Sequence, residues 1–99
     1  MTINRKLNGN TLEIAVEGKL DALTAPVLTE ELKNGLDGVE YLVWDFEKLD
    51  YISSAGFRVL LVAQNCLEDP DNMKVIHANE MVRQAFTLTG QGSLLSDAG

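Results

Sequence analysis

The stretch that most restricts the fold is residues 41–46, which read Tyr-Leu-Val-Trp-Asp-Phe. A near-continuous apolar run of this length is typical of a strand in the middle of a sheet, with other elements covering both of its faces. We therefore expect a sheet with helices packed on it, and we expect residues 41–46 to form its central strand.

Further strands are predicted on both sides of this run. Apolar and polar residues alternate over residues 11–17, which predicts a half-buried strand that ends at Gly18. The Asn-Gly pair at Asn8-Gly9 is a hairpin signal and predicts a turn back to a weaker strand over about residues 3–7. Residues 73–78 predict one more strand.

Three helices are predicted between and after these strands. Thr24 has the character of an N-cap for the first helix, and Gly35 and Gly38 mark the end of this helix. The second helix should run from Ser54 to about residue 67 and should be well buried, because it is apolar over much of its surface. Asn79 can cap a third helix, and Gly90 is a C-terminal stop signal.

Together these segments predict one α/β domain over residues 1–99, with the order β-β-α-β-α-β-α and a short last strand as an option. The predicted architecture is a mixed sheet with helices against it. Right-handed crossovers would bring Asp21, the polar turn at residues 45–50 and the start of the second helix to one rim of the sheet.

The charge of the chain narrows the range of partners. Eight basic and 15 acidic residues give a formal net charge of −7, which repels nucleic acid and anionic lipid. The first residues lack the apolar stretch of a signal peptide, and no apolar run is long enough to span a membrane. Cys66 is the only cysteine, which fits a reducing compartment. We expect a soluble, cytoplasmic protein without membrane insertion.

The residues Ser53-Ser54-Ala55-Gly56 stand where a strand should give way to the second helix. One interpretation is helix capping by a serine side chain, which contributes about 0.5–2 kcal/mol relative to alanine. One cap needs only one serine, however, and the small residues that follow leave backbone N–H groups open to another surface or to a phosphate. Capping and a modifiable serine therefore both remain open on spacing alone.

Several stretches resemble the STAS domain of bacterial anti-sigma factor antagonists. They are Gly18-Lys19-Leu20-Asp21 with the following Thr24-Ala25, the apolar strand at residues 41–46, and residues 51–61. The resemblance runs in order from about residue 3 to Gly90, most of the chain. Gly-x-Leu-Asp alone is a weak motif, whereas the serine-rich junction at the right distance from it is more specific.

The resemblance implies a binding function that is switched at Ser54, which stands three residues after Tyr51 and two before Gly56. In this family the serine at that position is phosphorylated by a partner that is both a serine kinase and an anti-sigma factor. The unphosphorylated antagonist binds this partner and frees the sigma factor, and a serine phosphatase of the metal-dependent type resets the cycle. The chain would then be no enzyme and would need no cofactor or metal of its own.

The resemblance also implies which residues contact the partner. Asp21 matches the family aspartate in the loop beside the switch serine. The other expected contact residues are Thr24, Ser53, Ala55 and Gly56. Ser53 replaces an acidic residue of the best-studied members, and it is the second choice as phosphoacceptor.

The C-terminal end departs from the family. Members usually carry a final strand and helix after the glycine that matches Gly90, but only nine residues follow it here. The last helix should therefore be short or absent, which would expose apolar surface and favour self-association.

Two chemical alternatives involve His77, the single histidine. A serine hydrolase would use Ser54 as nucleophile, His77 as base and a carboxylate such as Asp45, but Ile52 stands where the nucleophile elbow needs its first glycine. His77 is therefore interpreted as structural.

A metal site is not expected, because His77 and Cys66 alone form no ligand set. The acids Asp45, Glu47 and Asp50 could hold a weak cation, but they are interpreted as a solvated turn.

The functional alternative is a STAS module outside sigma-factor control. Such a chain would be a non-phosphorylated scaffold subunit of a stress-sensing or lipid-transport ATPase assembly. The same surface would then bind a protein, and Ser54 would only serve the helix.

Overall fold

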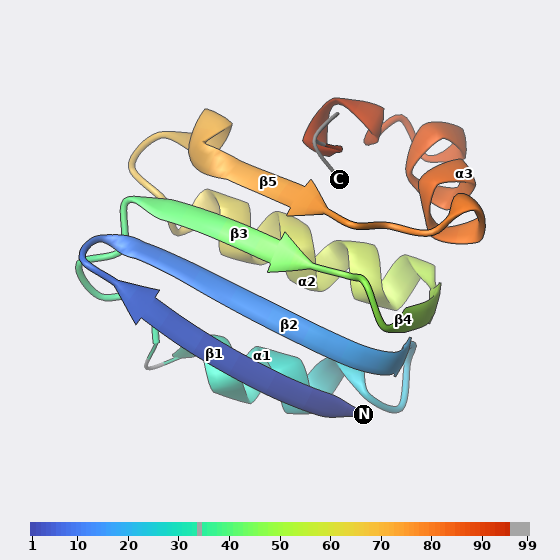
Figure 1. Ribbon diagram of the computed structural model, residues 1–99, viewed down its shortest axis with the longest axis horizontal. Coiled ribbons are helices and arrows are strands. Elements are labelled where there is room, and N and C mark those ends of the chain that lie inside the picture. Colours follow the sequence, from blue (N-terminus) through green and yellow to red (C-terminus); the bar gives the residue numbers. More distant parts are fainter. Residues whose placement is uncertain (34, 96–99) are drawn as a thin grey trace.

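The computed structural model describes residues 1–33 and 35–95 of the chain (Figure 1). Strands β1 (Thr2–Asn8) and β2 (Thr11–Leu20) are followed by helix α1 (Ala25–Lys33), strands β3 (Tyr41–Asp45) and β4 (Leu49–Ile52), helix α2 (Ser54–Asn65), strand β5 (Met73–Ile76) and helix α3 (Glu80–Leu88). Short 3-10 turns, η1 (Pro70–Asn72) and η2 (Gly92–Leu94), precede β5 and follow α3. The predicted α/β class is confirmed, with β4 as an additional strand.

The sheet has the strand order β1-β2-β3-β5, with β4 paired to the end of β2. β1 is antiparallel to β2, whereas β2, β3 and β5 are parallel to one another, and β4 is parallel to β2. The carboxyl ends of all the parallel strands therefore meet at one border of the sheet, here called the carboxyl edge. β3 lies between β2 and β5, so its predicted central place is confirmed.

The hairpin between β1 and β2 turns directly after Asn8, the last residue of β1. Asn8 pairs with Thr11, so the turn contains only Gly9 and Asn10. Gly9 has a φ of 64°, in the left-handed region that glycine adopts without the steric cost of a Cβ atom. The predicted turn is confirmed.

β2 does not end at Gly18, and in this respect the prediction is wrong. Gly18 has a φ of 97°, and the pairing register shifts between Gly18 and Lys19. The strand continues through this irregularity to Leu20 and exchanges its neighbour from β3 to β4. The sequence predicts a polar turn over residues 45–50, but Leu49 and Asp50 belong to β4, whose buried residues are Leu49 and Ile52.

α1 and α2 cover the same face of the sheet, as Figure 1 shows. Leu12, Ile14 and Trp44 point into this layer and are 1% exposed or less. The opposite face is only partly covered, since Tyr41 is 44% exposed and Val43 is half-buried. The expectation that both faces of the central strand are covered is therefore wrong: the helices lie on one side, and the apolar side chains of Tyr41 and Val43 contribute to the open face.

Aromatic packing fixes α3 near the carboxyl edge. Phe86 is fully buried and lies edge-on against Phe57 of α2, with ring centroids 4.7 Å apart. The ring centroid of Phe46, directly after β3, lies 6.3 Å from that of Phe86. These three rings join α3 to α2 and to the sheet.

The termini of α3 follow the sequence signals. The Asn79 carboxamide oxygen accepts a hydrogen bond from the Val82 N–H at 2.9 Å, and its NH₂ group donates to the Leu49 carbonyl at 3.0 Å. Asn79 therefore caps α3 and ties it to β4. Gly90, just beyond the helix, has a φ of 77°. Both predicted end signals are confirmed.

After α3 the chain returns to β5. Leu94 is buried, and Leu95 forms a single bridge with Val75. Within the described residues the optional last strand amounts to this bridge, and residues 96–99 of the predicted short C-terminus lie outside them. Over residues 1–33 and 35–95, no helix is both long enough and apolar enough to cross a membrane.

Candidate functional site

The junction between β4 and α2 lies at the carboxyl edge, directly beside the end of β2. The Ser53 N–H donates to the Leu20 carbonyl at 2.9 Å, and the Ser53 carbonyl accepts the N–H of Phe57 at 3.1 Å. Ser53 has an extended backbone, with φ −102° and ψ 176°, which is the conformation of an N-cap residue. The start of α2 is therefore joined to β2 by the backbone hydrogen bond between Ser53 and Leu20.

The two serines of this junction have opposite environments. Ser54 is the first residue of α2 and its side chain is exposed. The Ser53 hydroxyl is buried, and among the described residues it has no hydrogen-bond partner. Ser53 occupies the N-cap position without forming a side-chain capping bond, so the structure does not support the capping interpretation for Ser53.

Gly56 faces the end of β2, at a point where α2 lies very close to the sheet. A Cβ atom at this position would lie 2.8 Å from side-chain carbons of both Leu20 and Ile52, and 2.9 Å from the Leu20 carbonyl oxygen. The close approach of α2 to the sheet therefore requires glycine. Gly56 was predicted to be a partner contact, but its burial gives it a packing role beneath its neighbours in the site.

Ala55 lies on the other side of the helix start, at the mouth of a groove between α1 and α2. This groove has a volume of about 470 Å³, and its lining includes Pro26 of α1 with Val59 and Val62 of α2. Ala55 is half-buried in this lining, with the side chain of Arg58 beside it. The site at Ser54 thus continues into a mainly apolar groove.

Asp21 and Thr24 close the loop between β2 and α1. One Asp21 carboxylate oxygen accepts from the N–H groups of Leu23 at 3.0 Å and Thr24 at 3.2 Å. The hydrogen bond from the Thr24 N–H is the largest cause that holds the pKa of Asp21 below its ordinary value of 3.8. The Leu23 N–H and the charge of Lys19 also lower this pKa, and partial desolvation opposes them.

The Thr24 hydroxyl is committed to this loop as well. It accepts from the Asp21 N–H at 2.9 Å and donates to the Lys19 carbonyl at 2.8 Å. The Thr24 carbonyl accepts the N–H groups of Val27 and Leu28, as an N-cap carbonyl does. Thr24 therefore stands at the predicted N-cap position, but its side chain faces back to Asp21 instead of capping α1.

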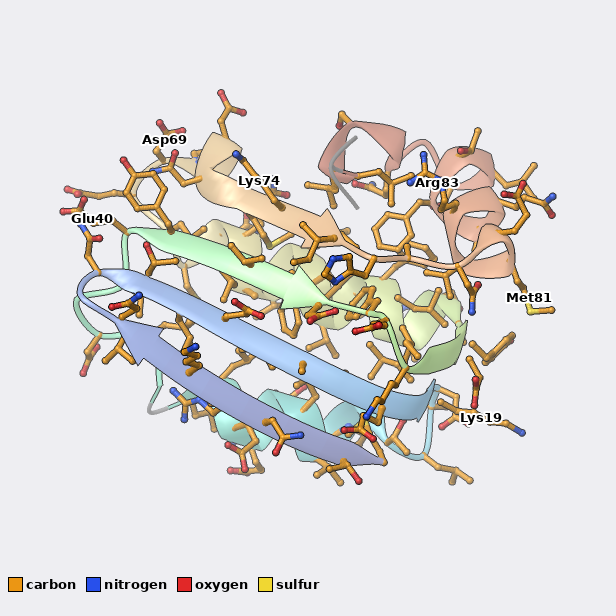
Figure 2. The ribbon with its side chains drawn as sticks, viewed as in Figure 1. Lys19, Glu40, Asp69, Lys74, Met81 and Arg83 are labelled. Carbon is orange, nitrogen blue, oxygen red and sulfur yellow. The ribbon has the colours of Figure 1, made fainter. Side chains whose placement is uncertain are left out.

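Exposed apolar side chains near this edge were missed by the sequence analysis. Leu23, in the Asp21 loop, is 87% exposed, and Met81, in the first turn of α3, is 63% exposed. Figure 2 places Met81 and Lys19 at the end of the molecule where β4 leads into α2. Met81 could have been found, because it lies outside the stripe of α3 that buries Val82 and Phe86.

His77 forms a second polar group at the carboxyl edge. Its Nδ1 lies 3.0 Å from a carboxylate oxygen of Asp45, and the same oxygen accepts the Glu47 N–H at 3.0 Å. A serine hydrolase would also need His77 to contact the nucleophile. Within the described part of the chain, no hydrogen bond joins His77 to Ser54.

Sequence and structure comparisons agree with this geometry. The family model of the STAS domain matches residues 2–95. The anti-sigma factor antagonist BtrV of Bordetella bronchiseptica is 34% identical over 87 residues, which cover 86% of this chain and 74% of BtrV.

Two solved structures share the fold at lower identity. The anti-sigma factor antagonist SpoIIAA in its unphosphorylated form matches with a TM-score of 0.86 at 22% identity, covering 99% of this chain and 89% of its own. The phosphorylated form of the Bacillus protein SpoIIAA matches with a TM-score of 0.75 at 20% identity, covering 99% and 92%. The resemblance seen in the sequence is thereby confirmed: the chain belongs to the STAS domain family, among the anti-sigma factor antagonists, which generally act by binding and not as enzymes.

Proposed function

We propose that this chain binds an anti-sigma factor serine kinase. Phosphorylation of Ser54 by this partner would dissociate the complex, so that the sigma factor is no longer released. The observation that carries the proposal is the contrast between the two serines: Ser54 is exposed at the start of α2, whereas the Ser53 hydroxyl is buried. A kinase can reach only the first without opening the junction.

The start of α2 suits a phosphate. The first N–H groups of a helix have no partner within it and carry a partial positive charge, so an anion there is stabilised. The first turn of α2 contains no acidic residue that would already use this effect. A phosphate on Ser54 would therefore be tolerated by the fold.

The same phosphate would oppose docking. It adds nearly two negative charges to a surface that also presents Leu23 and Met81. Burying an unpaired charge in an interface costs on the order of 2–5 kcal/mol, which corresponds to a more than tenfold loss of affinity. SpoIIAA has been solved in both phosphorylation states, and both structures share this fold, which supports a modification that the fold tolerates.

In this cycle the chain contributes a hydroxyl group and a docking surface. The kinase supplies nucleotide, metal and base, so the chain itself needs no catalytic residue. Asp21 would hold its loop, with the exposed Leu23, against the partner. A serine phosphatase of the metal-dependent type would restore the hydroxyl, and the cycle would operate in the cytoplasm, where sigma factors meet RNA polymerase.

The first test is mass spectrometry of the chain recovered from its native host, beside the variants Ser54→Ala and Ser53→Ala. We expect one phosphate that maps to Ser54, is lost in Ser54→Ala and persists in Ser53→Ala. Phosphate on Ser53 would keep the switch and contradict its assigned residue. Unmodified protein under every growth condition would refute the switch and favour the non-phosphorylated scaffold.

The second test separates charge from shape. Ser54→Asp and Ser54→Asn introduce side chains of nearly equal size, and only the first is charged. The kinase that copurifies with the wild-type chain should bind Ser54→Asp at least about tenfold more weakly than Ser54→Asn. Equal affinities of the two variants would contradict an electrostatic switch.

A further inference from the structure

A second cluster of polar side chains lies at the carboxyl edge, and the proposed switch at Ser54 does not use its residues. Asp45 is the last residue of β3, Glu47 follows two residues later, and His77 comes directly after the neighbouring strand β5. One ligand atom from each of the three lies within 4.8 Å of the others. Residues 32 apart in the sequence are thus brought to one point by the parallel pairing of β3 with β5.

The cluster opens on the face of the sheet that the helices leave uncovered. Asp45 pairs with Ala15 and alternates with the inward-facing Trp44. A hollow of about 170 Å³ beside it is lined by Ala15, Val16, Glu17, Asp45 and Glu47, with Lys48 as the one basic residue of the lining. Among the proposed ligands, the two carboxylates of Asp45 and Glu47 carry a charge of −2, which a divalent cation would balance.

We propose that Asp45, Glu47 and His77 bind a divalent transition-metal cation, with Zn²⁺ as the best match. One imidazole nitrogen and two carboxylate oxygens are ligands that Zn²⁺ accepts, and water would complete the coordination. The imidazole sets this cluster apart from an ordinary acidic turn, because Ca²⁺ and Mg²⁺ prefer oxygen ligands alone.

The separations fit such an ion. Two ligands that each lie about 2.0–2.1 Å from a tetrahedral Zn²⁺ are about 3.3 Å apart. The Asp45 carboxylate oxygen and the His77 Nδ1 are already 3.0 Å apart. The Glu47 side chain is exposed, so rotation about its own bonds can bring its carboxylate to the third position.

The experiment is calorimetric titration of Zn²⁺ into the full chain carrying Cys66→Ser, since Cys66 is an exposed thiol that could bind the ion elsewhere. We expect one ion per chain and a loss of affinity of about tenfold or more in each of Asp45→Asn, Glu47→Gln and His77→Asn. Asn is chosen at residue 77 because His77 has a φ of 60°, a conformation that Asn tolerates well. Asp50→Asn, an exposed acid of β4 outside the cluster, should bind Zn²⁺ as the parent chain does.

A second measurement reports on the imidazole directly. His77 is the only histidine of the chain, so its ring carbon-bound protons give one assignable pair of NMR signals. These signals should shift in step with the added Zn²⁺ and should not shift with Ca²⁺ at the same concentration.

Three outcomes would overturn the proposal. Equal Zn²⁺ affinity in the Cys66→Ser parent and in its His77→Asn variant would remove the imidazole from the site. Equal affinity for Ca²⁺ and Zn²⁺ would indicate an acidic surface only. Unchanged His77 signals at saturating Zn²⁺ would leave the Asp45–His77 contact as a simple hydrogen bond. None of these results depends on whether Ser54 is phosphorylated, so this proposal and the switch can fail separately.

Discussion

At the scale of single residues, the two adjacent serines show that similar side chains can have different roles. Ser53 supplies backbone hydrogen bonds to Leu20 and Phe57, while its hydroxyl has no partner within the described residues. Leaving a buried hydroxyl unpaired costs about 1–3 kcal/mol. Its neighbour Ser54 is exposed and carries no such cost.

The first prediction follows from this contrast. Ser53→Ala removes the unpaired hydroxyl and loses no capping bond, so the free energy of unfolding should stay the same or rise by about 1 kcal/mol. Ser54→Ala, the control, should change it by about 0.5 kcal/mol or less. Urea denaturation of the three proteins measures both effects. A loss of 1 kcal/mol or more in Ser53→Ala would mean that this hydroxyl caps α2 in solution.

Asp21 gives the second prediction, which concerns pH. Hydrogen bonds from the Thr24 and Leu23 N–H groups favour its charged form, so its pKa is lower in the folded than in the unfolded chain. The stabilisation that results is present in full above the unfolded pKa and is lost as the pH falls through the folded pKa. Asp21→Asn keeps an oxygen that can accept these bonds, but it does not titrate.

The unfolding free energies of wild type and Asp21→Asn should therefore be compared from about pH 7 down to about pH 2. The advantage of the wild type should be constant above the ordinary carboxyl pKa of 3.8 and should shrink below it. A difference that does not change with pH would show that the charge of Asp21 contributes nothing to the loop.

At the scale of elements, the site depends on how closely α2 approaches the sheet. Gly56→Ala would improve helix propensity by up to about 1 kcal/mol. Its new methyl group would, however, meet Leu20 and Ile52 at 2.8 Å, and overpacking of this kind typically costs about 1–3 kcal/mol. We predict a net loss of stability and a lower melting temperature, with Ser54→Ala in the same helix as the control. A more stable Gly56→Ala would contradict the close packing.

The elements also show what could be predicted from the sequence. The Asn-Gly turn, the Asn79 cap and the order of the three helices rest on local chemistry, and local chemistry is visible in the sequence. β4 was missed because a short strand that pairs with a bent neighbour has no periodicity of its own. Whether one face or both faces of β3 are covered depends on where α1 and α2 pack. Residues 41–46 alone do not determine this packing.

The same limits apply to the site. Asp21 and the start of α2 were expected at one rim, and the fold brings their strands together there, because parallel crossovers follow from the order of the elements. The inward direction of Gly56 depends on how α2 is rotated against the sheet, and the contact between Asp45 and His77 depends on the register of β3 with β5. A one-residue change in that register would turn the Asp45 and His77 side chains apart, and no signal in the sequence sets the register alone.

At the scale of the whole molecule, two properties with opposite effects decide whether copies associate. The net charge of −7 repels a second copy, whereas several large apolar side chains are exposed. Leu88, in the last turn of α3, is among the most exposed of them at 86%, while Leu94 beyond it is buried. Self-association remains a prediction, and α3 is the element to which we assign it.

The last prediction makes this balance measurable by sedimentation velocity. Raising the salt concentration from about 0.1 M to about 1 M shortens the screening length from about 10 Å to about 3 Å and weakens the repulsion between copies. The dimer fraction of the wild type should therefore rise with salt. Leu88→Ser should reduce this rise, whereas Leu7→Ser, a 64% exposed leucine of β1, should leave it unchanged. A chain that stays monomeric at both concentrations would refute self-association, and equal effects of the two variants would show that α3 is not its surface.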